Sequence, residues 1–132
     1  MLRIARALRD EMVAHSRADH PDEACGLVAG SGGAATRVIR MTNIARSPTF
    51  YEMDPREQLR VFNEMDDNDE DLVAIYHSHT ATGAYPSRTD ISIAGYPDVH
   101  YVLVSTRDAE DAEFRAYRIA DGIVTEEPVE LV

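Results

Sequence analysis

The sequence predicts one domain of the α+β (mixed α/β) class over residues 1–132, with a sheet as its core and about three helices around it. Three observations predict this class. A chain of 132 residues has the size of a single domain. Apolar runs of strand length are interrupted by three stretches of helical character. Apolar residues make up 44% of the chain and charged residues 28%, which is typical of a globular protein and excludes a wholly disordered one.

The first helix is expected at residues 5–18. Ile4, Leu8 and Met12 recur at intervals of four, so their side chains line one helical face. The helix should end near His20-Pro21, because the residue before a proline avoids the helical conformation.

A hairpin is expected next. Residues 25–29 form a short apolar run, and the Gly-Ser-Gly-Gly segment 30–33 closes it as a tight turn. Residues 36–44 are the expected partner strand. A further short strand is predicted at residues 50–53.

The second helix should begin at Asp54-Pro55, because Asp is a good N-cap and Pro is favoured at the first helical position. The acidic run 66–71 ends it. We interpret this run as a solvated turn, because it lacks the central Gly and the terminal Glu of a calcium loop. The side chains expected to face inward from this helix are Leu59, Phe62 and Met65.

The rest of the chain is predicted to be mainly strands. Residues 72–77 form the strongest strand pattern, and residues 101–105 form a second strong one. A short helix is expected at residues 87–94. Residues 114–119 alternate cleanly between apolar and polar, and residues 123–131 do so more weakly.

Charge and composition exclude several classes of function. Thirteen basic residues, all of them Arg, stand against twenty-four acidic ones, for a net charge of −11. Without a basic cluster, neither nucleic acid nor an anionic membrane is an expected partner. Without Lys, a catalytic lysine is excluded. No apolar stretch is long enough to span a membrane and the N-terminus does not resemble a signal peptide, so the expected location is cytoplasmic.

A candidate metal site lies at the end of the strongest strand. Side chains two positions apart on a strand share a face, so His77 and His79 can converge while Ser78 points away. Such a pair alone does not establish a metal site, because many His-x-His pairs on strands bind no metal.

Asp90, eleven residues after His79, allows two interpretations. Ser87 and Asp90 have the spacing of a capping box at a helix start. Two His and one carboxylate with an open fourth position also suit a catalytic zinc ion. Both interpretations place Ser87 and Asp90 at the beginning of a helix, and they differ in where the side chains point.

The last candidate lies upstream. Glu23 comes just before the apolar run that begins with Cys25-Gly26. By itself it is a polar residue at the entrance of a strand. In combination, a Glu before a Cys-Gly strand, then His-x-His, seven residues, Ser, two residues and Asp resembles the signature of the JAMM (MPN-plus) metallopeptidase family. The resemblance covers essentially the whole chain and implies a single JAMM/MPN-like domain, with a central, mostly antiparallel sheet flanked by about three helices.

The resemblance also implies roles for five residues. His77, His79 and Asp90 resemble the family's zinc ligands, with one Zn2+ per chain and water in the fourth position. Zinc lowers the pKa of such a water to about 7. Glu23 matches the general acid/base, and Ser87 matches the donor of a hydrogen bond to the oxyanion.

The substrate follows from the subgroup that the chain resembles. Ubiquitin isopeptidases usually carry Pro after the second His, whereas this chain has Thr80. The compact motifs are similar to bacterial stand-alone members that release cysteine from the C-terminal Gly of a ubiquitin-like sulfur-carrier protein ending in Gly-Gly, during cysteine biosynthesis. The alternatives are a deconjugase of other ubiquitin-like modifiers, a small peptidase, or a non-catalytic MPN scaffold. Scaffold members commonly lack ligands or the acidic residue, and this chain keeps all five positions.

Other reactive residues receive simpler interpretations. Cys25, the only cysteine, is expected to pack in the core, since no electropositive neighbour is evident. Thr82 and Tyr85 lie in the loop beside the predicted metal, where they are candidates for contact with substrate. The histidines without ligand-like spacing, expected at the surface or at strand ends, are His15, His20 and His100.

Overall fold

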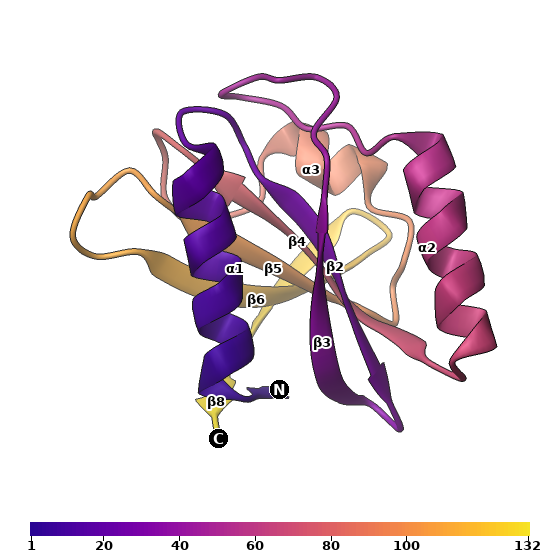
Figure 1. Ribbon diagram of the computed structural model, residues 1–132. Helices are drawn as coiled ribbons and strands as arrows, with labels where there is room; N and C mark the ends of the chain where they lie inside the picture. The colour runs from indigo at the N-terminus through magenta and orange to yellow at the C-terminus, as the bar shows by residue number, and fades with distance from the viewer.

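The computed structural model describes all residues from 1 to 132. Its centre is a six-stranded sheet with the strand order β3-β2-β4-β5-β6-β7, and a two-stranded sheet joins β1 to β8 (Figure 1). In chain order the elements are β1 (Leu2–Ile4), α1 (Arg6–Asp19), β2 (Cys25–Ser31), β3 (Ala34–Met41), α2 (Pro55–Asp67), β4 (Asp71–His79), α3 (Arg88–Ile93), β5 (His100–Ser105), β6 (Glu113–Ala120), β7 (Ile123–Glu127) and β8 (Val129–Leu131).

Antiparallel pairing dominates the large sheet, in which only β4 and β5 run parallel. Helix α1 packs on one face, and α2 and α3 pack on the other (Figure 1). This arrangement confirms the prediction of an α+β domain with a mostly antiparallel sheet and three helices. None of the helices combines the length and the apolar character needed to cross a membrane.

The two faces of β4 have different neighbours. Tyr76 is fully buried in the apolar cluster beneath α1. Ile75 belongs to the opposite cluster, which includes Val61 of α2. Because side chains alternate along a strand, His77 and His79 point to the same face as Ile75. The histidine pair therefore lies on the side of the sheet that α2 and α3 cover.

The end of β4 is held on both sides. His77 pairs with Cys25 of β2 and with Leu103 of β5. Beyond the ladder with β2, the Ser78 N–H donates to the carbonyl of Ala24 at 3.0 Å. The backbone around the histidine pair is thus fixed at the centre of a sheet, where the chain has little freedom to move.

Gly26, in the Cys-Gly pair, is required by a close approach of Tyr76. A Cβ added to Gly26 would lie 2.2 Å from Cε1 of the Tyr76 ring. The ring cannot move away easily, because Tyr76 is fully buried and its hydroxyl lies 2.6 Å from Nδ1 of His15.

We expect Gly26→Ala to lower the free energy of unfolding by about 1–3 kcal/mol, the usual cost of overpacking a core. Chemical denaturation of the purified variant measures this change. Gly95→Ala is the matched control, because the only atom within range of its added Cβ is the Ile93 carbonyl oxygen at 4.0 Å. A Gly26→Ala protein as stable as Gly95→Ala would contradict the packing argument.

Two sequence predictions for elements were wrong, and one strand was missed. Residues 50–53 do not form a strand, and only Met53 forms an isolated bridge, to Asn43. Residues 123–131 form two strands rather than one, because the chain leaves the large sheet at Pro128 and β8 pairs with β1. Strand β1 was not expected, because its three residues are too few to show a pattern and its partner lies at the other end of the chain.

The inward face of α2 was also predicted only in part. Leu59 is 62% exposed, so its assignment to the core was wrong. Met65 is buried as expected, and Phe62 is half-buried. Val61, which was not predicted to face inward, is buried in place of Leu59. The helix is rotated so that the pair spaced by four residues, Val61 and Met65, faces the sheet.

Candidate metal centre

Three side chains from two elements meet at the carboxyl end of β4. The Nε2 atom of His79 lies 3.0 Å from Oδ2 of Asp90, and Nε2 of His77 lies 3.2 Å from the same oxygen. The three donor atoms all lie within 4.8 Å of one another. The structure therefore brings together the two strand residues and the helix residue that the sequence singled out.

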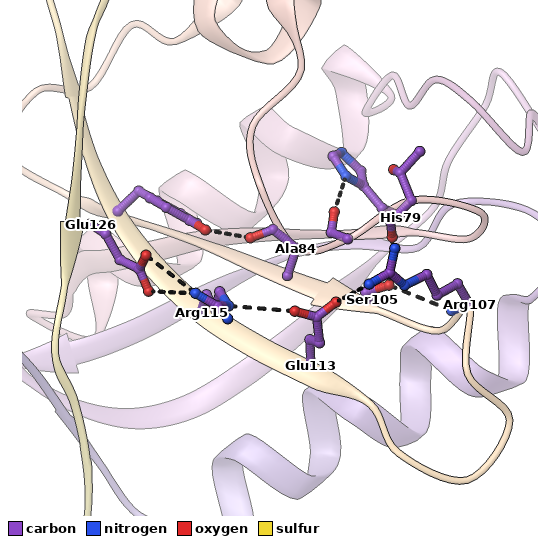
Figure 2. Close-up of polar contacts among 10 residues, drawn as sticks. His79, Ala84, Ser105, Arg107, Glu113, Arg115 and Glu126 are labelled. Carbon is purple, nitrogen blue, oxygen red and sulfur yellow. Dashed lines mark hydrogen bonds and ion pairs between the residues drawn. The ribbon is translucent and has the colours of Figure 1, made fainter.

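Each histidine ring is held in one orientation. Nδ1 of His79 lies 3.0 Å from the carbonyl oxygen of Gly83 and donates to it, so in the neutral ring Nε2 carries the lone pair that can coordinate a metal (Figure 2). The ring of His77 stacks on Tyr51, with 4.5 Å between ring centroids and 29° between planes. Both Nε2 atoms therefore point into the same space.

The donor set fits a metal ion. His77 is 5% exposed, and its Nε2 is a buried polar atom that forms no hydrogen bond despite lying 3.2 Å from Asp90. Buried polar atoms are nearly always satisfied, so this atom needs a further partner. A tetrahedral ion with bonds near 2.0–2.1 Å would separate its ligands by about 3.3 Å, close to the 3.2 and 3.0 Å that separate Oδ2 of Asp90 from Nε2 of His77 and of His79. His77, His79 and Asp90 could thus hold a metal.

The charges of Asp90 and His77 suit this role. Burial opposes ionisation of Asp90, but its contacts with the two histidines outweigh burial and hold its pKa well below the usual range. Burial lowers the pKa of His77, so its ring is neutral near pH 7 and able to coordinate. Burial would also lower the pKa of His79, but Asp90 and the Gly83 carbonyl raise it.

The structure shows the capping box that one interpretation of Ser87 and Asp90 predicts. The Asp90 N–H donates to Oγ of Ser87 at 3.1 Å, and Oδ2 of Asp90 accepts from the Ser87 N–H at 2.8 Å, which completes a capping box. The same Oδ2 atom faces the histidines. In the cap Ser87 uses its oxygen as an acceptor, so its hydroxyl hydrogen is free to donate, and the side chain is exposed to an incoming molecule.

Glu23 is buried at the entrance of β2, with 5% of its surface exposed. Burial raises the pKa of its carboxyl to about 7, while His79 lowers it and Asp90 raises it further. The backbone of Glu23 lies beside the end of β4, because the Ser78 N–H donates to the carbonyl of the adjacent Ala24. A carboxyl group that titrates near neutral pH can both accept and return a proton.

Asn43 is an organising residue that the sequence analysis missed. It is buried, and its side chain uses all four hydrogen bonds open to an amide. It donates to the carbonyl oxygens of Glu23 and Phe50, and it accepts from the N–H groups of Ala45 and Glu52. The only signal in the sequence was that an Asn after a strand favours a turn.

The loop that Asn43 organises, residues 43–53, is hydrogen-bonded to the residues just before β2 and just after β4. The Glu23 N–H donates to the Ser47 carbonyl at 2.9 Å. The hydroxyl of Thr80, where isopeptidases usually have Pro, donates to the Pro48 carbonyl at 2.9 Å. Together with the Tyr51–His77 stack, these contacts fix loop 43–53 against the cluster.

The loop between β4 and α3 is fixed from the opposite side. The hydroxyl of Ser105 donates to the Thr82 carbonyl, and the hydroxyl of Tyr117 donates to the Ala84 carbonyl (Figure 2). Tyr85 is 59% exposed and packs edge-on against Tyr117. That Thr82 and Tyr85 contact substrate stays a prediction.

The remaining reactive residues lie outside the cluster. Cys25 is fully buried, and burial raises the pKa of its thiol to about 12, in agreement with a packing role. His15 was expected at the surface, but it is buried between Tyr76 and Asp19, its two polar partners. His20 contacts Thr106 from an exposed position, and His100 begins β5 beside Glu127.

Comparisons with known proteins identify the family of the chain. A family model described as prokaryotic homologs of the JAB domain matches residues 5–120. The CysO-cysteine peptidase of Mycobacterium tuberculosis is 60% identical over 134 residues, covering 100% of this chain and 92% of that protein. The desampylase of Haloferax volcanii is 33% identical over 111 residues, covering 79% and 80% of the two chains.

A solved structure is also similar over the whole chain. Protein DSY2949 from Desulfitobacterium hafniense superimposes with a TM-score of 0.89 at 34% identity, covering 100% of this chain and 93% of that one. The family model, the relatives and the fold agree with one another, and the chain belongs to the prokaryotic JAB-domain family of JAMM/MPN-like proteins.

Proposed function

We propose that this protein is a zinc-dependent peptidase that hydrolyses the amide after the C-terminal Gly of a ubiquitin-like sulfur-carrier protein and releases cysteine. The observation that carries the proposal is the 60% identity, over the whole chain, to a protein named CysO-cysteine peptidase. The cluster of His77, His79 and Asp90 with Glu23 nearby supports a hydrolase. We also propose a single domain, and a cytoplasmic location in keeping with a free Cys25 and no disulfide.

His77, His79 and Asp90 would hold one zinc ion per chain. Two imidazoles and one carboxylate are ligands that catalytic zinc accepts, with a position left open for water or substrate. When bound, zinc supplies a water of lowered pKa and polarises the carbonyl of the amide. The Gly83 carbonyl fixes the tautomer of His79. A ligand histidine usually donates the N–H of its other ring nitrogen to such an acceptor.

Glu23 moves the protons of the reaction. Its carboxylate takes a proton from the attacking water, and the carboxylic acid returns that proton to the leaving amine. The water oxygen joins the carbonyl carbon and the C–N bond breaks, so the carrier regains its carboxylate and cysteine leaves with its amino group. A pKa of about 7 suits both steps.

Ser87 stabilises the negative charge that develops on the carbonyl oxygen. Its hydroxyl hydrogen is not used in the capping box, and the cap holds the side chain in position at the start of α3. A donor fixed before the reaction needs no rearrangement when the charge forms, which is why such donors accelerate acyl transfer.

The substrate can be tested by intact-mass spectrometry. A carrier–cysteine adduct and a linked di-ubiquitin are incubated with the zinc-supplemented enzyme, side by side. We expect the carrier adduct to lose the mass of one cysteine residue, and a chelator to block this loss. Cleavage of di-ubiquitin with the carrier adduct untouched would contradict the substrate while leaving the hydrolase in place.

A second candidate is a deconjugase of other ubiquitin-like modifiers, which the similarity to the Haloferax volcanii desampylase favours. A carrier joined through its C-terminal Gly to a lysine side chain separates the two candidates. Faster release from the lysine conjugate than from the cysteine adduct would favour the deconjugase. A non-catalytic scaffold is less well supported, because the chain keeps all five positions of the signature.

We expect Ser87→Ala to lower turnover by about 10²–10³-fold, the usual loss when one oxyanion donor is removed. If Ser87 only caps α3, the same variant would lose about 1 kcal/mol of stability and keep its turnover. Single-turnover assays and thermal melts of one protein distinguish these results. Ser87→Thr is the matched control, because it keeps a hydroxyl that can both cap and donate.

A further inference from the structure

An apolar pocket of about 350 Å³ opens beside the candidate metal centre. Eleven of its sixteen lining residues are hydrophobic. Its floor is the sheet, where Ile75, Leu103 and Ile119 are all buried. Two members of the metal cluster, His77 and Asp90, form part of its wall. The pocket therefore begins where the scissile amide would lie.

The rim of the pocket is apolar and exposed. Phe50 of loop 43–53 is 41% exposed, Ile93 of α3 is 54% exposed, and Tyr96 is 43% exposed. The only ionisable acids among the lining residues are Glu52 and Asp90, and no Arg is present. The pocket thus attracts apolar groups and repels carboxylates.

The position of the pocket limits what can fill it. On the proposed function, the residue on the carbonyl side of the amide is Gly, which has no side chain, and the residue before it is also Gly. The next carrier residue lies about 10 Å away, at roughly 3.3 Å per residue in an extended tail. The residue released by the reaction is attached directly to the scissile nitrogen. Its side chain is the group nearest to the pocket.

We infer that this pocket receives the side chain of the released residue and selects apolar side chains, including ones larger than that of cysteine. The inference rests on the proposed function and extends its substrate class. Pockets for small molecules begin at about 300 Å³. The single methylene and thiol of cysteine leave most of this volume empty, whereas Leu or Phe fills much more of it.

The test uses carriers that end in Gly-Gly and are extended by one residue, which is Cys, Ala, Leu, Phe or Asp. Intact-mass spectrometry follows release by the zinc-supplemented enzyme. We expect kcat/KM for Leu and Phe to equal or exceed that for Cys, and to exceed that for Asp by about tenfold or more, since apolar pockets discriminate by such factors. If Cys is released but kcat/KM for Leu and Phe is no higher than that for Asp, the pocket assignment alone is overturned. No release from any carrier would overturn the proposed function as well.

Two variants tie the selectivity to the pocket. Ala94→Phe fills it from the end of α3, so the ratio of kcat/KM for Leu to that for Ala should fall by about tenfold. Ile93→Ala removes part of the exposed rim with little risk to folding, and the same ratio should fall by several-fold. Ala14→Phe adds equal bulk at an exposed position of α1, on the other face of the sheet, and should leave the ratio unchanged. Unchanged ratios in both pocket variants would overturn the inference.

Discussion

Replacing His77 or Asp90 by Ala is expected to remove the bound metal and to lower turnover by more than 100-fold. Changes to groups that only support a ligand already cost about 10–100-fold in metal affinity or activity, so the loss of a ligand should cost more. Asp90 contacts both histidines through one oxygen, so its loss affects the whole cluster. Metal analysis of protein prepared with added zinc, together with a turnover assay, measures both effects.

His100→Ala is the matched control for these variants. His100 also lies beside a carboxylate, that of Glu127, but it is on β5, outside the cluster. This variant should keep both metal and turnover. If the wild-type protein holds no metal after zinc supplementation, or if His77→Ala keeps it, the metal assignment is wrong.

Glu23→Gln is expected to fold, to keep its metal and to lose about 10²–10⁴-fold in turnover, the usual contribution of a general acid/base. The amide has the same shape as the carboxyl but cannot take the proton from water. Single-turnover kinetics and metal analysis of the same preparation check the prediction. Activity within a few-fold of wild type would show that Glu23 is not the base, and loss of metal together with activity would indicate a supporting role at the ligands.

The pH dependence of the stability of the metal-free protein is an independent measure of the burial of the Glu23 carboxyl. Burial raises its pKa from 4.5 to about 7, so between these values the folded protein binds more protons than the unfolded chain. The stability of the metal-free protein should therefore fall as pH rises from about 4.5 to about 7, by an amount on the order of 3 kcal/mol. Glu23→Gln has no charge to bury, so its denaturation in a chelator should lack this part of the pH dependence. Equal slopes for the two proteins would contradict the buried position of the carboxyl.

The candidate site residues were predicted from the resemblance to the JAMM signature, and strand geometry by itself supported only the histidine pair. Alternation along β4 alone requires His77 and His79 to share a face. The approach of Asp90 could not be predicted from this argument, because it depends on the path of the loop from residue 80 to residue 87. That path is set by hydrogen bonds from Ser105 and Tyr117, which lie on strands far along the chain.

The parts of the fold that were missed depend on tertiary contacts. The two interpretations of Asp90 were treated as alternatives, whereas one carboxylate oxygen both accepts a hydrogen bond in the cap and faces the histidines, because the first turn of α3 lies against β4. Leu59 was assigned to the core from its apolar side chain, but the rotation of α2 is decided by how Val61 and Met65 meet the sheet. Asn43 was missed because its four partners combine Glu23, twenty residues earlier in the chain, with three residues of loop 43–53.

The small sheet made by β1 and β8 affects how the protein can fold during its synthesis. Leu2 and Ile4 are almost fully buried, and β1 pairs with Val129 to Leu131 of β8. At a translation rate of about 5–20 residues per second, the partner strand is made roughly ten seconds after β1. During that interval the apolar side chains of β1 have no strand to pair with. The layer of the core beneath α1 is therefore completed last, and the nascent chain exposes it to chaperones and to other chains for most of the time that synthesis takes.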